Sequence, residues 1–415
     1  MSFMEAPIAI PPDLPSPPSG WQWYKLTDIA RLESGHTPSR SRPDWWRGDV
    51  SWISLTEIRA LDGTWVERTQ LRTNEHGIAN SSARILPHGT VCFSRTASVG
   101  FVTVMAAPMA TSQDFANWVC GDKLDPDFLM YALICSRREL RELATGATHK
   151  TIYMPTLEAF HLCAPSIEEQ GQIAASLKAQ LAEVETARQA ARAQVRDAEL
   201  LRQRLLRQAF ATLHDAPRKV LGQWAKTTSG STPPRGDKRY WSPAEIPWVK
   251  TGEVAFASIM HTEESISRQA LAECSLTLLP PRTVLIAMYG QGKTRGQSAI
   301  LEIEATTNQA CFAVFPNETW DADFLHHWLM ASYEDLRGLS DGRGGNQANL
   351  NGGLLNALEI PAPDVGEQRR IVTRLKSQLT EADAIAQAAA AQLAEIKRLP
   401  QKLLAQAFTP QGEME

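Results

Sequence analysis

The stretch LTDIARLESGHTPSRSRPDWW at residues 26–46 recurs as LGQWAKTTSGSTPPRGDKRYW at residues 221–241. Both copies contain Ser-Gly-x-Thr-Pro and both end on a tryptophan. Further matches follow in the same order: Trp52-x4-Glu57 with Trp248-x4-Glu253, Leu86-Pro87 with Leu279-Pro280, Thr111-x-Gln113 with Thr307-x-Gln309, and Asp127-Phe-Leu with Asp323-Phe-Leu. A repeat of this length predicts two homologous globular domains.

Each half continues into a segment that is typical of a long helix. Ser166–Glu169 and Asp364–Glu367 fit capping boxes, and each follows a proline. The residues after the first box are rich in Ala, Leu, Glu, Gln and Arg, with no Gly or Pro between Ile173 and Ala216. We therefore expect one long helix after each domain.

The apolar residues of these two segments recur at spacings of four and three. They are Leu177, Leu181, Val184, Ala191, Val195, Ala198 and Leu205 in the first, and Leu375, Leu379, Ala382, Ala386, Ala389, Leu393, Ile396 and Leu403 in the second. Such a seam needs another helix to bury it. The other long helix is the expected partner, and the alternative is that each helix packs on its own domain. Pro400 occupies a seam position and predicts a kink.

Composition restricts the function classes. The formal net charge is −4, so there is no basic surplus to announce a nucleic-acid binder. The six cysteines show no CxxC spacing, and the adjacent His326 and His327 should point away from each other on a helix, so no metal site is expected. The sequence has no apolar run of membrane-spanning length and no signal peptide, which predicts a cytoplasmic protein without a membrane partner.

Motifs for chemistry are missing. A methyltransferase would need Asp/Asn/Ser-Pro-Pro-aromatic, and none of the Pro-Pro pairs is followed by an aromatic residue. The run from Gly290 to Thr294 resembles a phosphate loop, but its first required glycine is replaced by Ala287. We expect a turn that presents Gln291, Lys293 and Arg295 to DNA, and no catalysis by this chain.

Hydroxyl, amide and basic residues gather in and after the repeated loops, where they could bind phosphates and base edges. The alternative is that Thr and Pro only build a turn while the charges are solvated. The candidates are Ser34, Thr37, Ser39, Arg40, Arg42, Ser94, Arg95, Ser98, His149 and Lys150 in the first half, and Ser229, Thr232, Arg235, Lys238, Arg239, Gln291, Lys293, Arg295, Asn346 and Gln347 in the second. The recurring Trp46/Trp241 and Trp52/Trp248 are expected to pack in the core, because two halves would not share base-stacking residues if they read different sequences.

With these motifs the chain resembles the specificity subunit of type I restriction–modification systems. The resemblance rests on the opening Ser19-Gly-Trp-Gln-Trp23, on Ser-Gly-x-Thr-Pro in both halves, and on Pro-x-x-x-Glu-Gln-x-x-Ile at 165–173 and 363–371. It departs from the family at 148–150, where Thr-His-Lys stands in place of Gln-rich sequence. It implies two target-recognition domains that each read half of an asymmetric split site in double-stranded DNA, and helices that act as a ruler for the gap.

The resemblance also implies partners. Two modification subunits would methylate adenine with S-adenosylmethionine, restriction subunits would cleave with ATP and Mg, and this chain would hold no cofactor. The alternatives are a protein-only coiled-coil adaptor, the reader subunit of another methylation-based defence system, and a nuclease or methyltransferase with a fused reader.

The expected fold is mixed α/β, with two homologous target-recognition domains separated by two long helices that form an antiparallel coiled coil, in a pseudo-twofold internal repeat. The expected segments are a flexible Pro-rich lead (1–18), the first domain (19–165), the central helix (166–214), the second domain (215–363), the C-terminal helix (364–410) and a tail (411–415).

Overall fold

The computed structural model describes residues 6–12, 14–146, 150–290, 292–339 and 349–409. The chain divides into two compact units, which we call unit 1 (Met1–Ala190 with Leu393–Glu415) and unit 2 (Ala191–Gln392). Each unit contains one copy of the sequence repeat.

Unit 1 is built on a five-stranded sheet of order β3-β10-β7-β8-β5. Its strands are β3 (Ala30–Ser34), β10 (Phe115–Cys120), β7 (Val91–Ser94), β8 (Val102–Met105) and β5 (Trp65–Val66). All neighbours are antiparallel except β5 and β8. Every residue of β7 and β8 is buried, because helix α4 (Pro126–Cys135) packs with one face of the sheet and a second apolar cluster covers the other.

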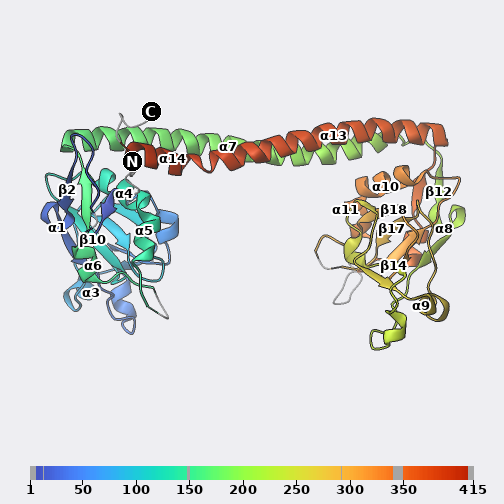
Figure 1. The fold of residues 1–415 in the computed structure, drawn as a ribbon, viewed down its shortest axis with the longest axis horizontal. Coiled ribbons are helices and arrows are strands. Elements are labelled where there is room, and N and C mark those ends of the chain that lie inside the picture. The colour runs from blue at the N-terminus through green and yellow to red at the C-terminus, as the bar shows by residue number, and fades with distance from the viewer. Residues whose placement is uncertain (1–5, 13, 147–149, 291, 340–348, 410–415) are drawn as a thin grey trace. The chain divides into compact units, whose positions relative to one another are not determined.

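Unit 2 repeats this plan with a sheet of order β13-β20-β17-β18-β15. Its strands are β13 (Thr227–Ser229), β20 (Cys311–Val314), β17 (Val284–Ala287), β18 (Ser298–Leu301) and β15 (Ser258–Ile259). Helix α10 (Ala322–Ala331) takes the place of α4 (Figure 1). The matching strand order confirms the two homologous domains.

Smaller sheets and short helices complete each unit. The sheets are β6 (Arg72–Thr73), β4 (Val50–Ile53) and β9 (Ala110–Thr111), then β16 (Glu264–Ile266), β14 (Ile246–Val249) and β19 (Thr306–Thr307), and the pair β12 (Arg218–Val220) and β21 (Glu359–Pro361). The helices are α1 (Leu26–Ile29), η1 (Pro43–Trp46), α2 (Ile58–Leu61), α3 (Glu75–Ala79), α5 (Arg137–Glu142) and α6 (Met154–Glu158) in unit 1, and α8 (Leu221–Trp224), η2 (Lys238–Tyr240), η3 (Thr251–Glu253), α9 (Arg268–Glu273), α11 (Tyr333–Gly338) and α12 (Gly352–Asn356) in unit 2.

The Pro-rich lead is not a free arm along its whole length, which corrects the expectation for residues 1–18. Strand β1 (Ile8–Ala9) pairs with β11 (His161–Ala164), which in turn pairs with β2 (Gln22–Lys25). Ile8 is buried in the core, and its N–H donates to Ser136 Oγ at 3.1 Å. β1 is an edge strand, so the prolines around it do not remove N–H groups that a neighbouring strand would need.

The predicted long helices are present. Helix α7 (Ile167–Ala211) is continuous over 45 residues, and its counterpart is α13 (Val365–Ile396) followed by α14 (Leu399–Ala407). The N-cap half of each expected capping box forms, since Glu169 N–H donates to Ser166 Oγ at 3.3 Å and Glu367 N–H to Asp364 Oδ1 at 3.0 Å. The break between α13 and α14 confirms the kink at Pro400. A proline inside a helix lacks an N–H and clashes with the preceding turn, but it is tolerated near the start of a helix, which is its place in α14.

The two helical segments pair within each unit. In unit 1, α14 lies beside the first part of α7 (Figure 1), and Leu177 shares a core with Leu404. In unit 2, Leu206 from the later part of α7 clusters with Leu375 and Leu379 of α13. Within unit 2, Arg202 Nε lies 3.3 Å from Asp383 Oδ1, while the later Leu206 clusters with the earlier Leu375 and Leu379, so the two segments are antiparallel. The predicted seam is followed except at its last position, where Leu206 and Leu404 are buried and the expected Leu205 and Leu403 are only partly buried.

The phenylalanine at the end of each long helical segment packs on the helix that covers the sheet of the same unit, α4 or α10. The ring of Phe408 lies 5.2 Å from that of Phe128 on α4, and the ring of Phe210 lies 5.5 Å from that of Phe324 on α10. The repeated Leu-Leu-x-Gln-Ala-Phe sequence therefore fastens the helices to the sheet domains.

A buried glutamine at each junction makes a second attachment. Gln170 accepts from Asp125 N–H at 3.0 Å and donates to the carbonyls of Pro165 (3.0 Å) and Lys123 (3.2 Å). Gln368 accepts from Asp321 N–H and donates to Pro363 and Thr319, each at 2.8 Å. Both side chains are at most 1% exposed. This explains why a glutamine recurs five residues after each proline, at Gln170 and Gln368.

Within the described ranges, no helix is long and apolar enough to cross a bilayer, and no cluster of His, Cys, Asp and Glu could hold a metal ion. His326 and His327 do not point apart as expected, because their rings lie 5.2 Å from each other in the core. Burial lowers the pKa of His326 to about 3.

Candidate nucleic-acid interface

The Ser-Gly-x-Thr-Pro loop is fastened the same way in both units. The Thr37 hydroxyl donates to Gln113 Oε1, and the Thr232 hydroxyl donates to Gln309 Oε1. A Cβ on Gly35 would overlap Thr111 and Ser112. Glycine is therefore required where the loop crosses the Thr-x-Gln segment, and this contact explains why the two motifs recur together.

An arginine stands on a pair of tryptophans after each loop. The guanidinium carbon of Arg40 lies 3.9 Å from the ring centre of Trp46 and 5.0 Å from that of Trp52. Its counterpart Arg235 lies 4.0 Å from Trp241 and 5.0 Å from Trp248. Trp52 and Trp248 are 2% and 1% exposed, which confirms core packing for that pair, whereas Trp46 and Trp241 are half-buried.

In unit 1 the structure brings three predicted segments together around Gln113. Arg95 Nη2 donates to Gln113 O at 2.9 Å, Ala97 N–H donates to Lys150 O at 3.0 Å, and Ile152 N–H donates to Arg95 O at 2.9 Å. Thr37, Arg95, Ser98 and Lys150 therefore belong to one surface.

Unit 2 forms the matching surface around Gln309. Met288 N–H donates to the carbonyl of Ala310 at 2.8 Å, and Leu350 N–H donates to the carbonyl of Met288 at 3.0 Å. The loop between β17 and β18 is thus placed beside the Ser-Gly-x-Thr-Pro loop.

That loop between β17 and β18 has a backbone suited to glycine. Gly290, Gly292 and Gly296 have φ of 140°, 73° and 87°. Tyr333 OH donates to Lys293 O at 2.6 Å, and Arg337 Nη1 donates to Arg295 O at 3.1 Å. The Lys293 side chain is exposed, as a DNA contact requires. Unit 1 has an equivalent brace, in which Arg141 Nε donates to Val99 O at 2.9 Å.

Two of the residues predicted to contact DNA are buried. Ser94 is fully buried, and its hydroxyl donates to Ser98 O while accepting from Phe101 N–H. Arg295 is 8% exposed, so it does not face solvent in the way Lys293 does. Both residues hold loops in place. The candidates His149, Gln291, Asn346 and Gln347 lie outside the described residues.

Several predicted basic residues are paired with acids. Arg42 bonds Asp44 at 2.9 Å, and Arg239 bonds Asp237 at 2.7 Å. Hydrogen bonds from these arginines hold the pKa of Asp44 and of Asp237 below the ordinary value, so both acids are ionised at neutral pH. Ser34, Ser39, Ser229, Lys150 and Lys238 are exposed.

Sequence reasoning missed Glu264 and Lys250. Glu264 on β16 accepts from Arg235, and Lys250 Nζ lies 3.2 Å from the same carboxylate. The hydrogen bond from Arg235 holds the pKa of Glu264 below its ordinary value. No local signal could reveal this cluster, because strand pairing across β14 and β16 creates it.

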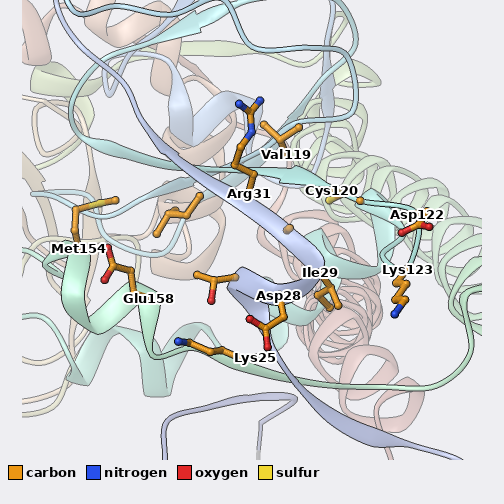
Figure 2. Close-up of a pocket in the computed structure, with 14 residues that line it drawn as sticks. Lys25, Asp28, Ile29, Arg31, Val119, Cys120, Asp122, Lys123, Met154 and Glu158 are labelled. Atoms are coloured by element: carbon orange, nitrogen blue, oxygen red, sulfur yellow. The ribbon is translucent and has the colours of Figure 1, made fainter.

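A different hollow lies at the other end of β3 and β10 in unit 1 (Figure 2). Its charged residues are Lys25, Asp28, Arg31, Asp122, Lys123 and Glu158. Three bases against three acids give no net attraction for phosphate. Because the loops described above follow Ser34 and precede Phe115, this hollow is not part of their surface.

The comparisons with known proteins agree with this architecture. The family described as Type I restriction modification DNA specificity domain matches residues 18–192 and again 219–395. The MjaIX specificity subunit of Methanocaldococcus jannaschii is 23% identical over 315 residues, which cover 71% of this chain and 72% of that one. The EcoR124I/EcoR124II specificity subunit of Escherichia coli is 27% identical over 155 residues, covering 37% and 38% of the two chains.

Among solved structures, the HsdS subunit of Thermoanaerobacter tengcongensis has the same fold. It aligns with a TM-score of 0.64 at 20% identity, covering 98% of this chain and 99% of that one.

The chain therefore belongs to the type I restriction–modification DNA specificity family. It is a sequence-specific DNA-recognition subunit, and it carries the family's domain twice.

Proposed function

We propose that the chain reads a two-part site in double-stranded DNA, one part with each unit. Methylation with S-adenosylmethionine and ATP- and Mg-dependent cleavage would be carried by its partner subunits. The observation that carries the proposal is one loop surface built twice on the same scaffold, with different side chains at its tip. Unit 1 presents Ser98 and Lys150 there, whereas unit 2 presents Lys293.

The test determines which DNA sequence is methylated in cells that carry this chain together with its partner subunits, and compares the wild-type chain with variants. Lys150→Ala should relax one half of the methylated sequence, and Lys293→Ala should relax the other half, by about 1–3 kcal/mol of discrimination if the residue contacts a base. Arg196→Ala, which removes an exposed arginine from α7, serves as control. A wild-type site that is undivided, or a single substitution that alters both halves, would contradict two-part reading.

A groove on the helix pair occurs once in each unit and supports two copies of one partner. In unit 1 it is lined by Glu169, Gln172, Ile173, Ser176, Leu177, Gln180, Leu403, Gln406 and Ala407. In unit 2 it is lined by Glu367, Arg370, Ile371, Arg374, Leu375, Gln378, Leu205, Gln208 and Ala209. Each residue of one set occupies the repeat position of the other. We infer that each groove takes part of one modification subunit.

The measurement is native mass spectrometry of the chain with its modification subunit. Gln180→Trp fills the groove of unit 1, and Gln378→Trp fills that of unit 2. Each variant should carry one partner copy, the double variant none, and the wild type two. A full complement of partners on the double variant would show that the grooves are not the docking sites.

A further inference from the structure

The tryptophan pairs under Arg40 (Trp46 and Trp52) and under Arg235 (Trp241 and Trp248), which we call the platforms, are hydrogen-bonded to the loop in both units. The indole N–H of Trp52 donates to His36 O at 3.1 Å, and that of Trp46 donates to Ser39 O at 3.2 Å. The rings of these tryptophans meet edge to face, with centres 4.8 Å apart at 81°. The loop residues on either side of Thr37 are thus tied to two rings.

Unit 2 repeats each of these contacts. Trp248 donates to Ser231 O at 3.0 Å, Trp241 donates to Pro234 O at 3.1 Å, and their rings meet at 5.3 Å and 86°. The guanidinium groups that stand on the two platforms differ by only 0.1 Å in their distance to the outer ring, at 3.9 and 4.0 Å.

This repetition decides what the arginines bind. If the two units read different base sequences, a side chain held identically in both has to contact something that every duplex offers, which is the phosphate backbone. A guanidinium stacked on an indole keeps its N–H edges available for a bidentate phosphate contact. Stacking also fixes its orientation before DNA arrives.

We propose that Arg40 and Arg235 are sequence-independent phosphate clamps, and that Trp46 and Trp241 are the positioning residues that aim them. This inference rests on the proposed function, since it assumes that the loop surfaces face DNA. It assigns base reading to the residues that differ between the units.

The two clamps differ in whether the arginine is already paired with a carboxylate. Glu264 pairs with Arg235, and it stands opposite Trp248 in the β14–β16 register. In unit 1, Leu71 takes that place, since its carbonyl accepts from Trp52 N–H at 3.1 Å. No carboxylate is paired with Arg40 among the residues that the structure describes. Arg40 can therefore bind phosphate directly, whereas Arg235 has to break its ion pair with Glu264 or keep it while binding phosphate.

The experiment titrates the full-length chain into a fluorescent random-sequence duplex and into a duplex that contains the methylated site, at several salt concentrations. Arg40→Ala should weaken binding to both duplexes by the same factor. It should also reduce the slope of log affinity against log salt by about 0.9, the value for one phosphate contact. Arg40→Lys should retain most of that slope, and Arg196→Ala on α7 should change it little. Glu264→Gln should tighten binding to both duplexes.

Trp46→Leu tests the positioning role through a double-mutant cycle. It should lower affinity for both duplexes, and Arg40→Ala added to it should cause little further loss. Losses that simply add, or an Arg40→Ala that changes the ratio of site to random affinity or leaves the salt slope intact, would overturn the clamp. A wild-type chain that binds neither duplex at low salt would instead refute the proposed function.

Discussion

The buried glutamines at the two junctions permit a quantitative prediction. Gln170→Glu and Gln368→Glu keep the size and the acceptor oxygen of the side chain, but an ionised carboxylate cannot donate. The carbonyls of Pro165 and Lys123 in unit 1, or of Pro363 and Thr319 in unit 2, would then lose their donor. At about 1–3 kcal/mol for each buried unsatisfied group, either substitution should cost about 3 kcal/mol of unfolding free energy.

For units of this size, about 3 kcal/mol corresponds to a fall in melting temperature of roughly 6–12 °C. Hydrogen exchange on the full chain localises the effect. Gln170→Glu should raise exchange in α4, whose N-cap Asp125 it holds, and leave α10 unchanged. Gln368→Glu should do the reverse through Asp321.

The direction with pH is a further check. Protonation of the introduced glutamate restores one donor, so the loss should shrink as pH falls and grow as it rises. Melting temperatures within about 1 °C of wild type, or exchange that rises equally in both units, would refute the view that these glutamines hold each junction by hydrogen bonds.

Predictions for three other substitutions follow from the structure. His326 is buried in its neutral form, and burial lowers its pKa to about 3, so between about pH 3 and 6.5 the unfolded state binds more protons than the folded state. The free energy of unfolding should therefore rise with pH in this range, by up to about 1.4 kcal/mol per pH unit. His326→Met should remove that part of the pH dependence, as measured by urea unfolding. An unchanged slope would place the histidine in water. Gly35→Ala should destabilise unit 1 by about 1–3 kcal/mol, because its Cβ overlaps Thr111 and Ser112. Gly171→Ala on α7 meets nothing and should stabilise by up to about 1 kcal/mol, so equal melting curves for the two variants would contradict the close approach at Gly35.

The sequence predicts those features that depend on local spacing. The helix caps at Ser166 and Asp364, the seam that contains Leu177 and Leu375, and the break before Pro400 all follow from residues within one or two turns. Core packing of Trp52 and Trp248 follows from their recurrence in both halves, because a shared large aromatic residue indicates a shared scaffold.

The remaining features depend on contacts between distant segments. Ser94 is a plausible DNA contact by residue type, but it ends a strand that is buried on both faces, so its hydroxyl serves the loop instead. The pairing of Arg235 with Glu264 requires the strand register, and the edge strand formed by Ile8 requires the surface of β11. Propensity around those residues carries no information about such partners.

The internal repeat allows the contacts of one unit to be compared with those of the other in the same chain. Contacts found in both units, such as Thr37–Gln113 with Thr232–Gln309, belong to the scaffold or to a ligand feature common to both half-sites. Positions that differ within that scaffold are the only ones that can give the two units different sequence preferences. If Arg40 and Arg235 bind phosphate as proposed, the loops that carry Lys150 and Lys293 can diverge without loss of those contacts. Separating the two roles in this way lets base preference change without rebuilding the fold.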